Sequence, residues 1–154
     1  MDPVWQTEFG ARHTALLLDS HRRLTGRELL PPAIDGRDAA RMLYEAAFVV
    51  VSHGTEADPV LNYGNAAALA LWEMSWEELT RTPSRFTAEE PNREERARLL
   101  AQVSAHGFID DYSGIRISKS GRRFRIGRAT VWNLADDAGV RRGQAATFDR
   151  WEWL

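Results

Sequence analysis

Side chains of metal-ligand type lie close together at one place in the first half of the chain. His53, Glu56 and Asp58 follow the apolar run FVVV, and Pro59 comes directly after them. A metal site needs three or four donors that converge and are held by further hydrogen bonds. These three share one short segment punctuated by Gly and Pro, which is typical of a solvated loop. We therefore predict a hairpin loop in which His53 hydrogen-bonds a turn carbonyl, and no metal site.

Asp110 and Asp111 are the other side chains whose pairing suggests chemistry, in this case acid–base catalysis. They fall in a segment with strand character, and adjacent residues of a strand point to opposite faces of a sheet. Two such carboxylates cannot easily act on one substrate. The chain also lacks the GxSxG, GxGxxG, HExxH and P-loop patterns. We therefore expect a protein that is not an enzyme.

The chain has no cysteine, which excludes disulfides, thiolate metal sites and a cysteinyl-flavin adduct. Haem needs an axial ligand, and since His106 at a predicted helix end is the only candidate, haem is not expected. A flavin bound without a covalent bond is held by amide and aromatic side chains. Asn62, Asn65, Asn133 and Gln144 are available for this, although the cysteine-containing photoreceptor motif is missing. The sequence leaves the identity of any cofactor unknown.

Four arginines cluster around one predicted turn, namely Arg122, Arg123, Arg125 and Arg128. Alternation along a strand places Arg123 and Arg125 on one face, where they could contact phosphate or an acidic partner. The net charge of the chain is −2, however, and nucleic-acid binding normally shows a stronger basic bias together with aromatic stacking. We expect a solvated sheet face and no nucleic-acid partner.

Length and hydropathy indicate a cytoplasmic protein. No apolar run approaches the about 20 residues of a membrane span, and no signal-peptide pattern opens the chain. We therefore expect no membrane association. The 154 residues are enough for one domain with an elaboration and a sizeable buried core.

The elements that position these residues begin with a helix. Apolar residues at helical spacing predict it from Asp2 to about Leu24, with Gly26 at its end. The sequence LLPP then forms a linker that cannot continue the helix. We predict an N-terminal helical arm and linker at 1–32, which is either docked on the main domain at 33–154 or used as a dimer contact.

The most informative pattern lies in the stretch FVVVSHGTEADPVLNYGNAAALALWEMSWEEL. Residues 48–51 and 60–63 have the composition of two short strands that pair as a hairpin. Asn65 is well placed to cap a helix that ends near Trp72. Residues 75–78 then form a capping box that begins the next helix.

The remaining segments complete an α+β pattern. Asp35 caps a predicted helix that runs to about Glu45, with Met42 and Leu43 facing inward. The other predicted elements are a helix over 93–105 capped by Asn92, strands over 108–117, 124–134 and 140–148, a change of phase near Gly127, and an amphipathic tail over 151–154 whose indoles cover an end of the sheet. This order predicts a five-stranded antiparallel sheet with short helices packed on one face.

Several blocks along nearly the whole chain resemble one family. They are FVVVSHG, DPVLNYGN, ALALWEMSWEEL, NREER, GFIDDYSGIRISKSGRRF, VWNL and GQAATFDRW. In this order they resemble the bacterial MEKHLA-domain proteins, here as a stand-alone member, although the six-residue stretch that names the family is absent. The resemblance implies a PAS-like fold and, by relation to PAS domains, a role in sensing light, oxygen or redox state.

A PAS-like fold offers one candidate site, the space between the inner face of the sheet and the short helices. Pockets of this kind are mostly apolar with a few polar groups. The side chains that we expect near it are Trp72, Trp76, Phe86, Leu100, Ile117, Phe124 and Trp132. They either line a ligand pocket or simply fill the core, because aromatic side chains bury large areas.

Three functions follow as hypotheses. The first is a sensory and signalling domain that binds a small molecule or responds to light, oxygen or redox state. The second is a protein-interaction module with a filled core that forms a homodimer. The third and weakest is a small-molecule enzyme that uses the same pocket. A cavity above roughly 300 Å³ favours the first hypothesis, and a core that is packed solid favours the second.

Overall fold

The computed structural model describes residues 3–31, 34–88 and 93–154 of the chain. Its helices are η1 (Val4–Gln6), α1 (Glu8–Thr25), α2 (Gly36–Glu45), α3 (Ala66–Trp72), α4 (Trp76–Leu79), η2 (Ser84–Thr87) and α5 (Arg93–His106). Its strands are β1 (Val49–His53), β2 (Leu61–Gly64), β3 (Phe108–Ile117), β4 (Arg123–Ala135), β5 (Arg141–Phe148) and β6 (Trp151–Trp153). None of the helices in these ranges is both long and apolar enough to cross a membrane.

The strands form one antiparallel sheet in the order β2-β1-β5-β4-β3, which confirms the five predicted strands. The C-terminal tail adds a sixth, because β6 pairs with the first part of β4 while β5 pairs with the second part. Trp153 of β6 lies edge-on to Phe124 of β4, with ring centroids 5.3 Å apart. The tail is therefore a strand, and its indole packs on the end of the sheet.

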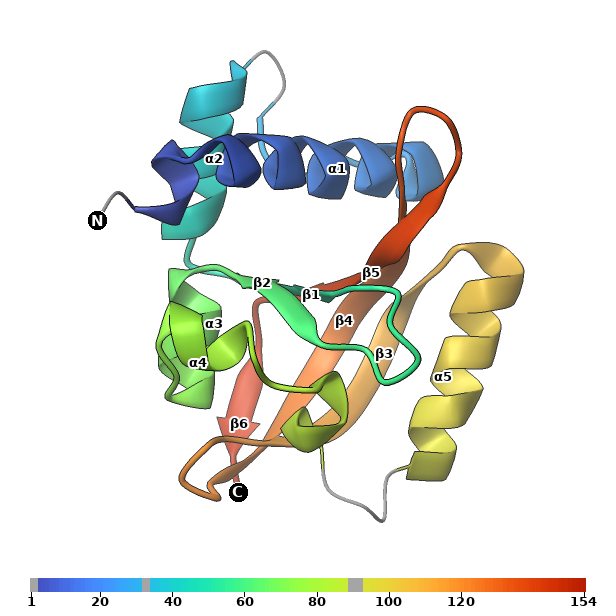
Figure 1. Cartoon of the computed structure of the whole chain (residues 1–154). Helices are drawn as coiled ribbons and strands as arrows, with labels where there is room; N and C mark the ends of the chain where they lie inside the picture. The colour runs from blue at the N-terminus through green and yellow to red at the C-terminus, as the bar shows by residue number, and fades with distance from the viewer. Residues whose placement is uncertain (1–2, 32–33, 89–92) are drawn as a thin grey trace.

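Helices cover both faces of the sheet (Figure 1). The adjacent residues Val49 and Val50 of β1 show how the strand divides its side chains between two cores. Val49 packs in the core under α3 and α5 with Trp72 and Val103. Val50 packs in the core under α1 and α2, where Leu17 is fully buried. The short helix α3 and helix α5 lie on one face, whereas the N-terminal arm covers the other together with the predicted short helix α2.

The arm helix begins later than the sequence indicates. Thr7 caps α1, because its side-chain hydroxyl accepts a hydrogen bond from the backbone N–H of Gly10 at 3.0 Å. The predicted cap at Asp2 lies outside the described residues. The predicted end is confirmed, since Gly26 takes the left-handed conformation (φ 73°) that favours glycine.

Two further local expectations have different outcomes. In α2, Leu43 is fully buried as predicted, but the prediction for Met42 is wrong, because 41% of its surface is exposed. Its place on the helix turns it away from the sheet. In β4, the change of phase is confirmed: Arg128 has a φ of 50°, so the buried residues switch from Phe124 and Ile126 to Ala129 and those that follow.

Asn65 joins three elements through its buried amide. Its Oδ1 accepts hydrogen bonds from the N–H of Ala68 at the start of α3 and of Val50 in β1, both at 3.1 Å. Its Nδ2 donates to the carbonyl of Leu43 in α2 at 3.1 Å and to that of Phe48 at 2.8 Å. The predicted helix cap is confirmed, and the same side chain also holds the end of α2 against β1.

We expect Asn65→Ala to lower the free energy of unfolding by about 3–4 kcal/mol, because it leaves several buried backbone groups without partners. Asp35→Ala is the matched control. Asp35 is an exposed cap. Among the described residues, its side chain accepts only the hydrogen bond from the N–H of Asp38, at 3.0 Å, so the loss of this side chain should cost about 1 kcal/mol. Urea unfolding measures both. Equal losses for the two variants would show that the extra contacts of Asn65 contribute nothing.

Candidate ligand-binding site

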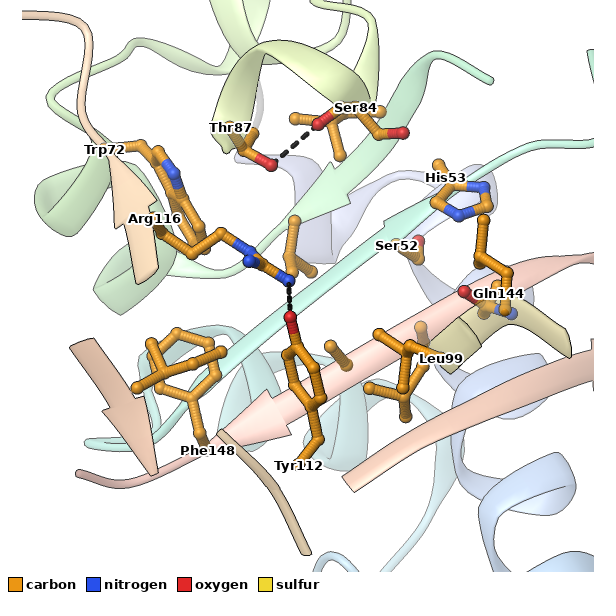
Figure 2. Close-up of a pocket in the computed structure, with 17 residues that line it drawn as sticks. Ser52, His53, Trp72, Ser84, Thr87, Leu99, Tyr112, Arg116, Gln144 and Phe148 are labelled. Atoms are coloured by element: carbon orange, nitrogen blue, oxygen red, sulfur yellow. Dashed lines mark hydrogen bonds between the residues drawn. The ribbon is translucent and has the colours of Figure 1, made fainter. Parts of the chain in front are cut away.

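A cavity of ≈ 80 Å³ lies between the inner face of the sheet and the segment formed by η2 and α5 (Figure 2). Its lining residues are Val51, Ser52, His53, Leu61, Trp72, Ser84, Thr87, Leu99, Leu100, Tyr112, Arg116, Ile126, Val131, Gln144, Ala145, Ala146 and Phe148. Apolar side chains dominate this lining. A few polar groups reach into it from β1, β3, β5 and η2.

Strand alternation brings the polar groups of the sheet to this face. Gln144 lies opposite His53 of β1 and Asn133 of β4 in the strand register. Its Nε2 donates to Oδ1 of Asn133 at 3.4 Å, and Nδ2 of Asn133 donates to the carbonyl of Val103 in α5 at 3.1 Å. This chain of hydrogen bonds ties α5 to the sheet beside the cavity.

Arg116 brings a positive charge to the cavity. Its Nη2 donates to Oη of Tyr112 at 2.9 Å, and its Nη1 donates to the carbonyl of Ile115 at 3.0 Å. The guanidinium lies 5.3 Å from the centroid of the Tyr112 ring, and Figure 2 shows it extending to the hydroxyl. No carboxylate of the described residues forms an ion pair with Arg116.

The register between β3 and β4 shifts beside this pair. Tyr112 pairs with Ala129 and Gly114 pairs with Ile126, so β4 has one residue more than β3 in this interval. A Cβ at position 114 would lie 2.4 Å from Oη of Tyr112. Glycine at this position therefore lets the tyrosine hydroxyl reach Arg116.

Trp72 forms the wall at the end of α3. Only 3% of its surface is exposed, and it packs edge-on against Phe124 and Phe148, with ring centroids 5.5 and 6.2 Å apart. Its indole Nε1–H is buried without a hydrogen-bond partner among the described residues. A buried donor without a partner is costly, so this group marks a place where a ligand acceptor would be stabilised.

A second buried polar group connects the arm to the cavity wall. The hydroxyl of Ser52 donates to Oδ1 of Asn62 at 2.6 Å, so it accepts a hydrogen bond from Nε2–H of His13 at 2.8 Å. The His13 ring stacks between Phe9 and Tyr63, with centroids 5.1 and 5.4 Å away. Burial lowers the pKa of His13 to about 4, which keeps the ring neutral near pH 7.

The sequence predictions for the cavity are partly met. Trp72 and Leu100 line it, and Phe124 packs behind Trp72. Ile117 is half-buried at the end of β3 and is not part of the lining. Phe86 is 55% exposed on η2. These last two side chains do not line the cavity.

Two tryptophans lie on the opposite side of the sheet from the cavity. Trp132 is fully buried in the core under α1 and meets His21 edge-on at 4.9 Å. Trp76 packs at the edge of the same core, 5.8 Å from the Tyr63 ring. Neither lies at the cavity: Val131 faces it, so the neighbouring Trp132 must face the arm, and α4 directs Trp76 toward Tyr63 in the other core.

Tyr112, Arg116 and His13 are not among the site residues predicted from the sequence. Tyr112, Gly114 and Arg116 are two residues apart, which places them on one face of a strand, and this signal was available. His13 and Leu17 are four residues apart on α1, which places them on one buried face of the helix. The partner of His13 lies 39 residues away in β1, and the sequence alone gives no sign of that contact.

The loop after β1 is a turn, as predicted. Nδ1 of His53 hydrogen-bonds the carbonyl of Gly54 at 2.9 Å. Glu56 accepts from the N–H of Val60 at 3.2 Å, and Asp58 pairs with Arg85 at 3.1 Å. The three side chains thus have separate partners, and the described residues contain no group of three or more metal-ligand side chains that could hold an ion.

The sequence profile of the MEKHLA domain matches residues 11–153 of the chain. The chain belongs to the MEKHLA domain family. The match confirms the resemblance seen in the sequence blocks, and it begins inside α1. A boundary between an arm at 1–32 and a domain at 33–154 stays a prediction.

Part of a plant protein is similar to this chain. The homeobox-leucine zipper protein ATHB-9 of Arabidopsis thaliana is 27% identical over 108 residues, which are 70% of this chain and 13% of ATHB-9. The chain therefore spans a small part of the length of this relative. At this identity the similarity supports the family assignment and says nothing of a shared activity.

Solved structures share the fold of this MEKHLA domain. The light-state dimer of the fungal blue-light photoreceptor Vivid has a TM-score of 0.59 at 16% identity, over 88% of this chain and 90% of Vivid. The PAS domain, in complex with ethanol, of a LuxR-family regulator from Burkholderia thailandensis has a TM-score of 0.52 at 19% identity, over 74% and 95%. The MEKHLA domain has a PAS-type fold.

The His13 contact predicts a pH dependence of stability. The unfolded chain binds a proton at His13 near the ordinary pKa of 6.5, and the folded chain binds it only near 4. The unfolded state therefore takes up more protons as the pH falls, and wild-type protein should lose about 2 kcal/mol of stability between pH 7 and pH 5. Urea unfolding at pH 7 and pH 5 measures this change in the free energy of unfolding. The His13→Gln variant should lose clearly less stability than wild type over the same range, and an equal loss would assign the effect to other groups.

Proposed function

We propose that this MEKHLA domain is a non-enzymatic sensory domain whose signal is the occupancy of the cavity by a small molecule. The observation that carries the proposal is the cavity itself. Apolar side chains surround it, and a few polar groups converge on it from several strands, which is the usual make-up of a ligand site. A PAS-type fold occurs in complex with a ligand as small as ethanol in the LuxR-family regulator.

The size of the cavity favours a small ligand. Its volume of ≈ 80 Å³ does not reach the roughly 300 Å³ named above for the first hypothesis, which is the lower end of the range for pockets that hold drug-sized molecules. Flavin and haem are larger than this space allows. A small metabolite therefore fits better than the cofactors with which a PAS-type domain would detect light, oxygen or redox state.

Ser52 offers a route from the ligand to the arm. It belongs to the cavity lining on β1, and it receives the hydrogen bond from His13 of α1. A ligand that alters the position of β1 changes the free energy of this contact, and it thereby shifts the population of docked and released arm. The readout of the sensor is, in this proposal, the state of α1.

A cytoplasmic location stays a prediction.

A variant that fills the cavity tests the proposal. Leu100→Trp adds volume at the cavity, and Ala101→Trp adds an indole on the exposed side of the same helix. Purified proteins are denatured and the released molecules identified by mass spectrometry. We expect a small molecule from wild type and Ala101→Trp, and at least a tenfold smaller amount from Leu100→Trp. The same yield of released small molecule from wild type and both variants would contradict binding in this cavity.

A homodimerisation module is the second candidate function. The observation that favours it is a groove of ≈ 850 Å³ beside α2, whose lining combines charged side chains with apolar ones that include Ile34, Met42 and Phe48. Exposed apolar surface of this kind is common where two chains meet.

Light scattering at increasing protein concentration tests this second candidate. We expect wild type to form dimers and Met42→Lys to stay monomeric at concentrations where wild type associates, because a charge is costly in an apolar interface. Ala101→Lys, on exposed surface of α5, is the control and should behave as wild type. Dimers of equal strength in both variants would exclude the groove as the contact.

A further inference from the structure

We propose that the ligand of the cavity is a short-chain monocarboxylate, with its carboxylate bound to Arg116. This inference rests on the proposed function and narrows it from a small molecule to one chemical class. Three observations lead to it: the charge of the lining, the free hydrogen-bond donors, and the size and polarity of the rest of the space.

The charge of the lining favours an anion. Among the 17 lining residues that the structure describes, Arg116 is the one arginine or lysine, and none is an aspartate or glutamate. A guanidinium is permanently charged at neutral pH. This one is half-buried and forms no ion pair within the described part of the chain. A half-buried charge without a counter-ion is stabilised by an anionic ligand.

The hydrogen-bond donors match a carboxylate. A guanidinium has five N–H donors, and Arg116 uses two of them, toward Tyr112 and Ile115. The remaining donors can form the paired contact that arginine makes with a carboxylate. The hydroxyl of Tyr112 accepts from Arg116, which leaves its own proton available to a ligand oxygen.

Trp72 supplies an independent sign of a ligand acceptor. Its Nε1–H is buried and has no partner among the described residues, and the residue belongs to the same lining as Arg116. An ionised carboxylate only accepts hydrogen bonds. It is therefore the kind of group that can satisfy an indole N–H and a guanidinium together.

The rest of the cavity sets the size and polarity of the ligand. About 10–15 Å³ holds one water-sized group, so ≈ 80 Å³ accepts roughly five to eight non-hydrogen atoms. Beyond Arg116, the walls include Leu99, Leu100, Val131 and Phe148. These apolar walls fit a short hydrocarbon chain and disfavour an ion that is polar on all sides, such as phosphate. Carboxylates of three to six carbons meet both conditions.

Titration with butyrate, followed by nitrogen–proton NMR of the full chain, tests the inference. Three probes are compared at constant ionic strength: sodium butyrate, 1-butanol and inorganic phosphate. We expect butyrate to bind at least tenfold more tightly than 1-butanol, and phosphate not to compete with it. The indole N–H resonance of Trp72, assigned with Trp72→Phe, should move downfield with butyrate.

Arg116→Gln should weaken butyrate binding by about 10- to 100-fold, as expected for a hydrogen-bonded charged pair, and should leave binding of 1-butanol unchanged. Arg125→Gln is the matched control. Arg125 lies on the neighbouring strand, is exposed and is not part of the lining, so its loss should change neither affinity. Circular dichroism verifies the fold of each variant. If Arg116→Gln does not fold, Arg116→Lys keeps the charge and should bind butyrate with intermediate affinity.

The outcomes of these experiments distinguish a failure of the carboxylate inference from a failure of the proposed ligand-binding function. Equal affinity for butyrate and 1-butanol, or no effect of either substitution of Arg116, overturns the carboxylate while the cavity remains a ligand site. Phosphate that displaces butyrate overturns it in favour of an inorganic anion. If neither butyrate nor 1-butanol moves the Trp72 resonance, the inference and the proposed function both fail.

Discussion

The buried amide of Asn65 is the contact on which the rest of the domain depends. It caps α3, accepts a hydrogen bond from the N–H of Val50, and donates to the carbonyls of Leu43 and Phe48. Its own N–H also donates to the carbonyl of Val50, at 3.1 Å. One residue therefore satisfies polar backbone groups at the junction of α2, β1 and α3, which would otherwise be buried without partners at a cost of about 1–3 kcal/mol each.

Strand β1, which Asn65 holds at its start, is shared by the two cores. Its alternate residues face the arm and the cavity. Ser52 lies at the boundary, since it takes part in the cavity lining and accepts the hydrogen bond of His13. The cavity and the arm thus contact the same strand, which is the route of the signal in the proposed function.

Local patterns were sufficient for most of the fold and for part of the site. The caps at Asp35, Asn65 and Ser75 and the left-handed Gly26 depend on residues near in sequence, and all are confirmed. The site residues were predicted less well because their positions depend on which face of a strand each side chain takes. A single left-handed residue, Arg128, changes that face within β4.

The sequence by itself determined the element order, the caps, the antiparallel hairpins and the family, because each is recorded in short stretches of residues. Only the tertiary structure decided that the arm covers the sheet face opposite the cavity and that Trp132 lies beneath it. It also decided that Arg116 donates a hydrogen bond to Tyr112 where the register between β3 and β4 shifts. The indole N–H of Trp72 has no hydrogen-bond partner among the described residues, which again follows from the tertiary structure. These features depend on contacts between segments far apart in the chain and on the space left between them, and neither leaves a local pattern. The stretch from β1 to α4 carries the clearest sequence signals, but its meaning for function comes from what packs against it.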